Sequence, residues 1–192
     1  MDDCDAGGIV KTMWTPTLAW LAAAGAALIL AFAGPSELAV MGRLPSLTAN
    51  QPGHRTIALP DELPARPTLA LVGFARTQKG EIDSWVQGLN LTRDDSIAWM
   101  KLPVLSDPGS APARKAALER LFERHSGRTD TARLLPVFTD RDAFVRTAGL
   151  SGMEHAGILV IGRDGRVLAR AEGHFDEGKA QALRETLFAQ NN

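Results

Sequence analysis

The stretch that decides the fold reads Thr68-Leu-Ala-Leu-Val-Gly-Phe74, then Ala75-Arg-Thr-Gln-Lys-Gly80, then Glu81-Ile-Asp-Ser-Trp-Val86. Its first seven residues are mostly apolar and β-favouring, which predicts a short buried strand. Between residues 79 and 89 the apolar side chains recur at helical spacing: Ile82, Trp85, Val86 and Leu89. This pattern predicts a helix with one apolar face. Strand, turn and helix together form a unit that is typical of α/β domains.

Downstream of this unit, strand patterns and helix patterns alternate. Apolar runs predict strands at 97–105, 134–138, 157–161 and 166–171. Amphipathic stretches predict helices at 110–125, 139–149 and 176–190. The dipeptide Asp164-Gly165 favours a tight hairpin between the last two strands. Because crossovers through a helix give parallel strands and a hairpin gives antiparallel ones, the sequence predicts an α/β domain with a mixed central sheet.

The same patterns predict which side chains are buried. Trp85 and Trp99 lie in apolar stripes and are predicted core residues. Two further helical stripes are predicted to face inward: Ala117, Leu118, Leu121 and Phe122 in the second helix, and Ala180, Leu183, Leu187 and Phe188 in the last. Ser110 is a candidate N-cap and Gly127 a candidate helix terminator, and Thr139 or Asp140 should cap the short third helix.

Composition excludes several classes of function. The chain has 192 residues, of which 45% are hydrophobic, and a formal net charge of -1. This length suits one domain with an appendage, and the near-neutral charge argues against nucleic-acid binding. Cys4 is the only cysteine, so an internal disulfide is impossible. Because the histidines lack the spacing of metal ligands and no phosphate-binding or dinucleotide-binding motif occurs, we expect no metal and no cofactor.

The N-terminal part of the chain has a different character. After a tail at 1–16, residues 17–33 contain no charged side chain. A membrane anchor is our preferred interpretation, although 17 residues is the lower limit for a transmembrane helix. Ala31-Phe-Ala33 also has the form of a signal-peptide cleavage site, and a peripheral helix is a third alternative. We therefore expect a single-pass membrane protein whose domain faces the periplasm, or alternatively a secreted or periplasmic protein after signal cleavage.

The segment 34–55 is rich in proline, glycine, serine and asparagine, with prolines at 35, 45 and 52. Such a composition blocks helices and interrupts strands, so we predict a linker there. A short strand is expected at 56–59, and the folded domain is predicted to span 56–192.

The strand, turn and helix at 68–89 resemble the active-site unit of thioredoxin-like proteins, in which a Cys-x-x-Cys begins the helix. There the helix dipole and backbone N–H groups lower the pKa of a thiol. The equivalent positions here read Lys79-Gly-Glu-Ile82. The segment Ile158-Leu-Val-Ile-Gly-Arg-Asp-Gly-Arg166 is similar to one in membrane-anchored thioredoxin-like proteins of the cytochrome-maturation and peroxiredoxin-related kind, and Ala156 takes the place of their cis-proline. The resemblance implies a three-layer thioredoxin-like fold that lacks its redox residues.

A second resemblance is to a cysteine-free branch, the mitochondrial F1Fo ATP synthase assembly factor family. It rests on short motifs: Gly149-Leu150, Ala156-Gly-Ile-Leu-Val-Ile161, Gly165-Arg-Val167 and Glu172-Gly173. The chain departs from the family at Gly162, Leu168 and Ala169. The resemblance implies a chaperone-like assembly factor that acts on a subunit of a membrane complex.

These resemblances lead to an expectation about function. We expect no enzyme and no catalytic residue, but a membrane-tethered module that binds a protein client. In redox relatives, the turn and the facing loop hold an extended peptide, so we name a candidate groove: Arg76, Gln78, Lys79, His155 and Ala156. Lys79 could instead bind an anion or simply be solvated. The alternative is a peroxiredoxin-like or cytochrome-maturation-type redox component that works with the thiols of a partner.

Overall fold

The computed structural model describes residues 41–53, 55–64, 67–127 and 130–189. The tail at 1–16, the uncharged segment at 17–33 and the first part of the predicted linker lie outside the described residues. Within the described ranges, no helix has the length and apolar character that crossing a membrane requires.

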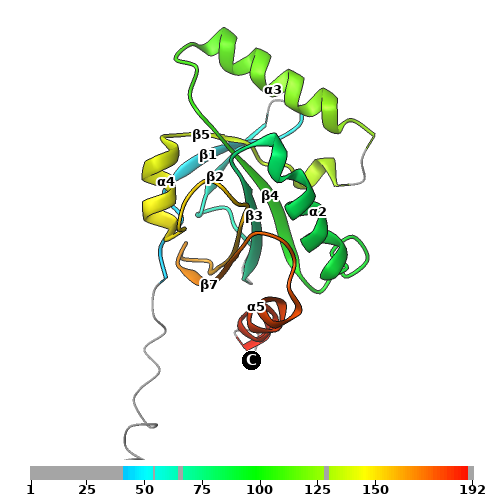
Figure 1. The fold of residues 1–192 in the computed structure, drawn as a ribbon. Helices are drawn as coiled ribbons and strands as arrows, with labels where there is room; N and C mark the ends of the chain where they lie inside the picture. Colours follow the sequence, from blue (N-terminus) through cyan, green and yellow to red (C-terminus); the bar gives the residue numbers. More distant parts are fainter. Residues whose placement is uncertain (1–40, 54, 65–66, 128–129, 190–192) are drawn as a thin grey trace, which may run out of the picture. The chain divides into compact units, whose positions relative to one another are not determined.

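A seven-stranded mixed sheet forms the centre of the domain (Figure 1), with the strand order β2-β1-β5-β4-β3-β6-β7. Its strands are β1 (Leu47–Asn50), β2 (Thr56–Leu59), β3 (Thr68–Gly73), β4 (Ala98–Leu105), β5 (Val137–Phe138), β6 (Gly157–Ile161) and β7 (Val167–Glu172). The β3–β4 and β4–β5 pairs are parallel, and all other pairs are antiparallel. The mixed sheet predicted from the alternating elements is therefore confirmed.

The helices lie close to their predicted positions. They are α2 (Lys79–Gly88), α3 (Ala111–His125), α4 (Arg141–Ala148) and α5 (Glu177–Ala189), with 3-10 turns η1 (Arg76–Gln78) and η2 (Thr131–Arg133). Ser110 caps α3 by accepting a hydrogen bond from the N–H of Ala113, and Asp140 caps α4 by accepting one from that of Ala143. Gly149, at a φ of 74°, ends α4 in the left-handed conformation that favours glycine.

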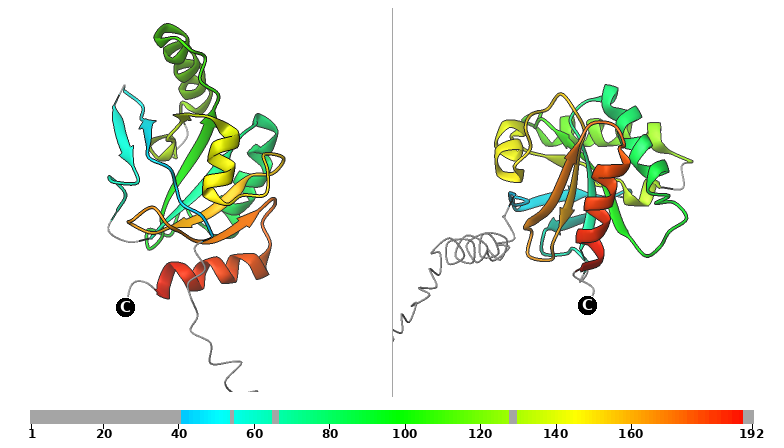
Figure 2. Two further views of the ribbon diagram at one scale, coloured as in Figure 1. Left: turned by 90° about the vertical axis from the view of Figure 1, so that its left-hand side faces the viewer. Right: turned by 60° about the horizontal axis from the view of Figure 1, so that its bottom comes forward.

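Two hydrophobic cores lie on opposite faces of the sheet, because alternate residues of β3 point to opposite sides. Leu69 and Leu71 join the core under α2 and α5, which includes Trp85 and Leu183. Ala70 and Val72 join the other core, which includes Phe144 of α4. The helices thus form a layer on each face of the sheet, as expected for a three-layer fold (Figure 2). Both tryptophans predicted to be core residues, Trp85 and Trp99, are buried.

The predicted linker is too long. Its second half forms β1, which pairs antiparallel with β2 and joins β5 through Ala49 and Val137. Ala49 and Leu44 are fully buried. The prolines at 45 and 52 flank this strand and do not interrupt it, so the folded part of the chain begins before residue 56.

Two predicted burial patterns are wrong in part. Phe188 of α5 is 44% exposed, although Leu183 and Leu187 point inward as expected. In the α3 stripe only Leu121 is buried, whereas Ala117, Leu118 and Phe122 stay half-exposed. The reason is the position of α3, which stands off from the sheet (Figure 1). This leaves a cavity beneath the helix.

Candidate functional site

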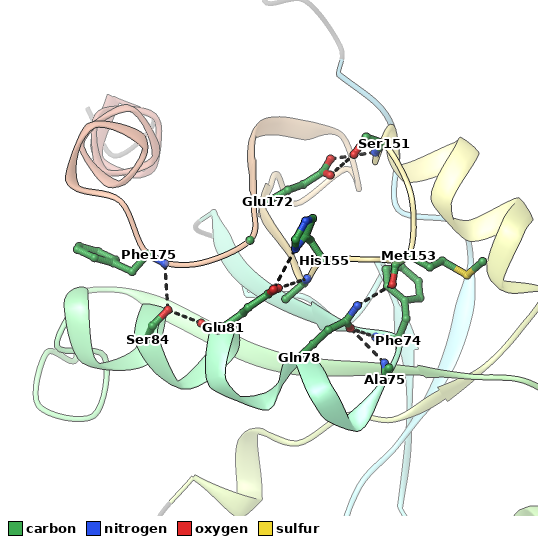
Figure 3. A network of polar contacts seen from close by, with 12 residues as sticks. Phe74, Ala75, Gln78, Glu81, Ser84, Ser151, Met153, His155, Glu172 and Phe175 are labelled. Atoms are coloured by element: carbon green, nitrogen blue, oxygen red, sulfur yellow. Dashed lines mark hydrogen bonds and ion pairs between the residues drawn. The ribbon is translucent and has the colours of Figure 1, made fainter.

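Gln78 closes the turn between β3 and α2 (Figure 3). Its side chain is buried, and its Oε1 accepts hydrogen bonds from the backbone N–H groups of Phe74 at 2.7 Å and Ala75 at 3.1 Å. Its Nε2 donates to the carbonyl of Met153 at 2.6 Å. One amide side chain therefore fixes the turn and ties it to the loop before β6.

Glu81, one helical turn further along α2, continues the connection. Its Oε2 accepts the backbone N–H of Ala156 at 2.6 Å, and its Oε1 lies 2.9 Å from Nδ1 of His155. Burial opposes ionisation of the carboxyl group, but the hydrogen bond from Ala156 and the contact with His155 outweigh it and lower the pKa of Glu81. The hydrogen bond with Glu81, followed by its negative charge, raises the pKa of His155. The two side chains form an ion pair when His155 is protonated.

Ser84 and Trp85 complete this face of α2. The Ser84 hydroxyl donates to the carbonyl of Glu81 at 2.6 Å and accepts the N–H of Phe175 at 3.0 Å. The Trp85 Nε1 donates to the carbonyl of Gly173 at 2.8 Å. The ring of Phe175 packs edge-on against Trp85, with 5.2 Å between the ring centroids. The segment that leads into α5 is therefore held on α2 by polar and aromatic contacts.

We call these four side chains the brace: Gln78, Glu81, Ser84 and Trp85. Their spacing of three and four residues places them on one side of the helix. Each binds a backbone group of the facing segments, at Met153, Ala156, Phe175 or Gly173. Because these groups already have partners within the chain, an extended peptide could pair with Ala156 only by displacing Glu81.

The structure separates the residues of the candidate groove. Gln78 is a buried side chain of the brace, and Ala156 is a buried residue whose N–H the brace binds. His155, with its side chain 63% exposed, lies beside them. Arg76 and Lys79 are exposed and line the cavity toward α3, where Lys79 forms an ion pair with Asp83. Lys79 and His155 therefore do not face one groove, although both sit near the start of α2.

Glu81 and Ser84 belong to the site but are not among the residues predicted for it from the sequence. The signal was present, since polar residues recur at 78, 81 and 84 on a helix whose apolar face is formed by other positions. Their role depends on backbone groups about 75 to 90 residues further along the chain, at Ala156 and Phe175. Helical spacing alone carries no information about such partners.

The chemistry available at the site is limited. The chain has no thiol other than Cys4, which lies outside the described residues. The described part of the chain also contains no group of three or more His, Cys, Asp or Glu side chains that could hold a metal ion. Lysine cannot replace the thiolate that attacks a disulfide. The side chains described at the site supply hydrogen-bond donors and acceptors.

Comparisons with protein-family models and with curated proteins find no match. Solved structures do match. A candidate electron transfer protein from Aquifex aeolicus VF5 has 8% sequence identity and a TM-score of 0.54, and the match covers 78% of this chain and 94% of that one. A candidate electron transport protein from the same organism has 9% identity and a TM-score of 0.53, with 78% and 96% covered. The exposed lipoprotein thioredoxin Etrx1 from Streptococcus pneumoniae has 12% identity and a TM-score of 0.48, with 73% and 99% covered.

At such low identities these similarities concern the fold alone. Together with the strand order and the three layers, they support the prediction of a thioredoxin-like α/β fold with a mixed sheet. The finer resemblance to the F1Fo ATP synthase assembly factor family gains no support from the comparisons and stays a prediction.

Proposed function

We propose that this chain is a redox-inactive thioredoxin-like module that binds a protein client at a membrane. The observation that carries the proposal is the brace. Gln78, at the N-cap of α2, and Glu81, in its first turn, bind backbone groups of the facing loop. Redox relatives place their cysteines and hold a peptide in this region. The hydrogen bonds of Gln78 and Glu81 hold the loop before β6 rigidly against α2, at a site that has no thiol. Such a rigid surface can still bind a protein client.

The brace also argues against the alternative, in which the domain assists thiol exchange by a partner. Such a role requires the partner's disulfide to approach the start of α2. Two buried or half-buried polar groups, Gln78 and the carboxylate of Glu81, are already hydrogen-bonded there. Displacing them would leave the backbone N–H of Ala156 without a partner, which is costly for a buried group.

The client surface that we propose is the exposed area next to the brace, centred on His155. Glu154 and Ser151 are also exposed there, and Ser151 is hydrogen-bonded to Glu172 (Figure 3). The uncharged segment 17–33 would hold the domain near a membrane client. A subunit of a membrane complex such as ATP synthase is the client that the second resemblance suggests.

Two measurements on the full chain test this proposal. The first is insulin reduction with a dithiol donor, with thioredoxin as the positive control. We expect the chain and its Cys4→Ser variant to show the same background rate. Turnover that depends on the chain would contradict the binding-module proposal and favour the redox alternative.

The second measurement is site-specific photocrosslinking in native membranes. A photoreactive residue at position 155 should capture one predominant protein. The matched control is position 163, where Arg163 is exposed in the turn between β6 and β7. Equal products from both positions, or none from position 155, would contradict the proposed client surface.

A further inference from the structure

A cavity of about 680 Å³ lies between α2, α3 and the sheet. Its wall is mainly apolar, formed by residues of β3, β4, both helices and the segment before β5: Leu71, Ile82, Leu105, Ala117, Leu121 and Leu134. The volume falls within the roughly 300–1,000 Å³ that is usual for small-molecule sites. The cavity exists because α3 stands off from the sheet and leaves its apolar stripe only partly covered.

Positive charge surrounds this apolar space. Arg76, Arg120 and Arg124 line the cavity, all three are exposed, and no residue in the described part of the chain forms an ion pair with any of them. The guanidinium group offers several N–H donors in a fixed fork that suits carboxylate and phosphate oxygens. An anion at this mouth would satisfy donors that the described residues leave without an acidic partner.

The two lysines that line the cavity differ from the arginines, because both have acidic partners. Lys79 is paired with Asp83, and the buried Lys101 lies 2.5 Å from Asp130 and 3.7 Å from Asp83. Asp83 is the only acidic residue among the described residues that line the cavity. Among the described residues that line the cavity, the arginines that have no acidic partner there are therefore Arg76 of η1 and Arg120 and Arg124 of α3.

We propose that this cavity binds a single-chain amphiphile whose apolar chain enters between α2 and α3 and whose anionic head group contacts the arginines. The shared chemistry of the ligand is an acyl or alkyl chain with a carboxylate or phosphate head. None of the four brace side chains lines the cavity, so the two sites use different side chains. They meet at Phe74 and Ala75, which line the cavity and whose N–H groups donate to Gln78. The cavity adds a small-molecule ligand to the proposed client-binding module.

Calorimetric titration of the full chain tests this assignment with three probes of equal chain length, used below their critical micelle concentrations. Dodecanoate carries a carboxylate, dodecyl phosphate carries a phosphate, and dodecyl maltoside is neutral. We expect at least one anionic probe to bind with a Kd about tenfold lower or more than that of the neutral probe, since each hydrogen bond to a charged group contributes on the order of a tenfold change. The tighter anionic probe identifies the head group. Equal affinity for all three probes would overturn the proposal.

Three variants locate the binding. Ala117→Trp fills the cavity from α3 and should abolish binding of the anionic probes, while its melting temperature reports whether it folds. Arg120→Gln should weaken binding about tenfold. Lys115→Gln is the matched control, because it removes one positive charge from the same helix at an exposed position outside the cavity lining. Its affinity should be unchanged.

The same variants distinguish binding of the probes in the cavity from binding to other apolar parts of the chain. Binding that survives both Ala117→Trp and Arg120→Gln would lie elsewhere, for example on segment 17–33, and would overturn the proposal. If Arg120→Gln and Lys115→Gln weaken binding of the anionic probes equally, the proposed role of the cavity arginines is likewise overturned.

Discussion

The carboxylate of Glu81 and the backbone N–H of Ala156 lie 2.6 Å apart, in a hydrogen bond that joins α2 to the residue directly before β6. The thioredoxin-like resemblance places a cis-proline at the position of Ala156. Proline has no N–H to donate, so this hydrogen bond requires the non-proline residue found here. Ala156 and Glu81 are therefore parts of one arrangement, in which a side chain of α2 binds the backbone N–H directly before β6.

Glu81→Ala should destabilise the domain by about 1–3 kcal/mol, because it leaves the N–H of the buried Ala156 without its partner. Urea unfolding of the full chain measures the effect. Glu119→Ala is the control, since Glu119 is exposed on α3 and its ion pair among the described residues is an i, i+4 contact with Lys115. Equal destabilisation by the two variants would show that the brace contributes little.

The contact between Glu81 and His155 should make stability depend on pH. The raised pKa of His155 means that its contribution is complete below its ordinary value of 6.5 and is lost as pH rises through the higher folded value. The lowered pKa of Glu81 means that its contribution is present above its ordinary value of 4.5 and is lost as pH falls through the lower folded value. The stabilising window therefore lies between these two ordinary values.

His155→Gln tests this dependence. The difference in melting temperature between wild type and variant should be largest between pH 4.5 and 6.5 and should shrink at higher pH. The charges of Glu154 and Glu172 also raise the pKa of His155, and the charge of His174 also lowers the pKa of Glu81. A difference that stays constant from pH 5 to pH 9 would contradict the ion pair.

Two glycines of α2 should respond in opposite ways to alanine. A Cβ at Gly88 would lie 2.4 Å from ring carbons of Phe175, so Gly88→Ala must push this ring away from Trp85. We expect a loss of about 1–3 kcal/mol from such overpacking. A Cβ at Gly80 would point into open space, so Gly80→Ala should stabilise the helix by up to about 1 kcal/mol. The melting temperatures of both variants test this prediction. A higher melting temperature for Gly88→Ala than for wild type would contradict the close packing of Gly88 against Phe175.

The ion pair of Lys101 and Asp130 should contribute more to the stability of the fold than the exposed pair of Arg114 and Asp107. Both members of the first pair are buried, and removing one leaves a charge without its nearest partner. Asp130→Ala should cost roughly 3 kcal/mol, the lower end of the range for buried pairs, because Asp83 remains 3.7 Å from Lys101. Asp107→Ala should cost about 0–1 kcal/mol. Chemical denaturation measures the free energy of unfolding of both variants. Equal losses of stability would contradict the larger role that we assign to the buried pair.

Local sequence patterns predicted most of the fold. The strand at 157–161 has the predicted bounds, and α2, α3, α4 and α5 begin and end within two residues of their predicted positions. These elements have strong periodicity and clear capping residues. Strand β1 was missed because it has four residues and is flanked by prolines at 45 and 52. Its stability comes from pairing with β2 and with Val137, almost 90 residues away in sequence.

The site was predictable only in part, for a geometric reason. Residues two positions apart on a helix point in nearly opposite directions, because each residue turns the helix by about 100°. Lys79 therefore faces the cavity, whereas Glu81 faces His155. The position of the turn followed from the sequence, but the side of the helix that meets the loop before β6 was set by tertiary packing.

Hydrogen exchange of the Ala156 amide, measured by NMR on the full chain, tests most directly whether Glu81 binds this N–H. In wild type this amide should be protected, and in Glu81→Ala it should exchange about tenfold faster or more, since losing a hydrogen bond worth about 1.4 kcal/mol changes an opening equilibrium about tenfold. The amide of Leu159, in the centre of β6, is the internal reference for global unfolding. Rapid exchange of Ala156 in wild type, or equal rates in wild type and Glu81→Ala, would contradict the account.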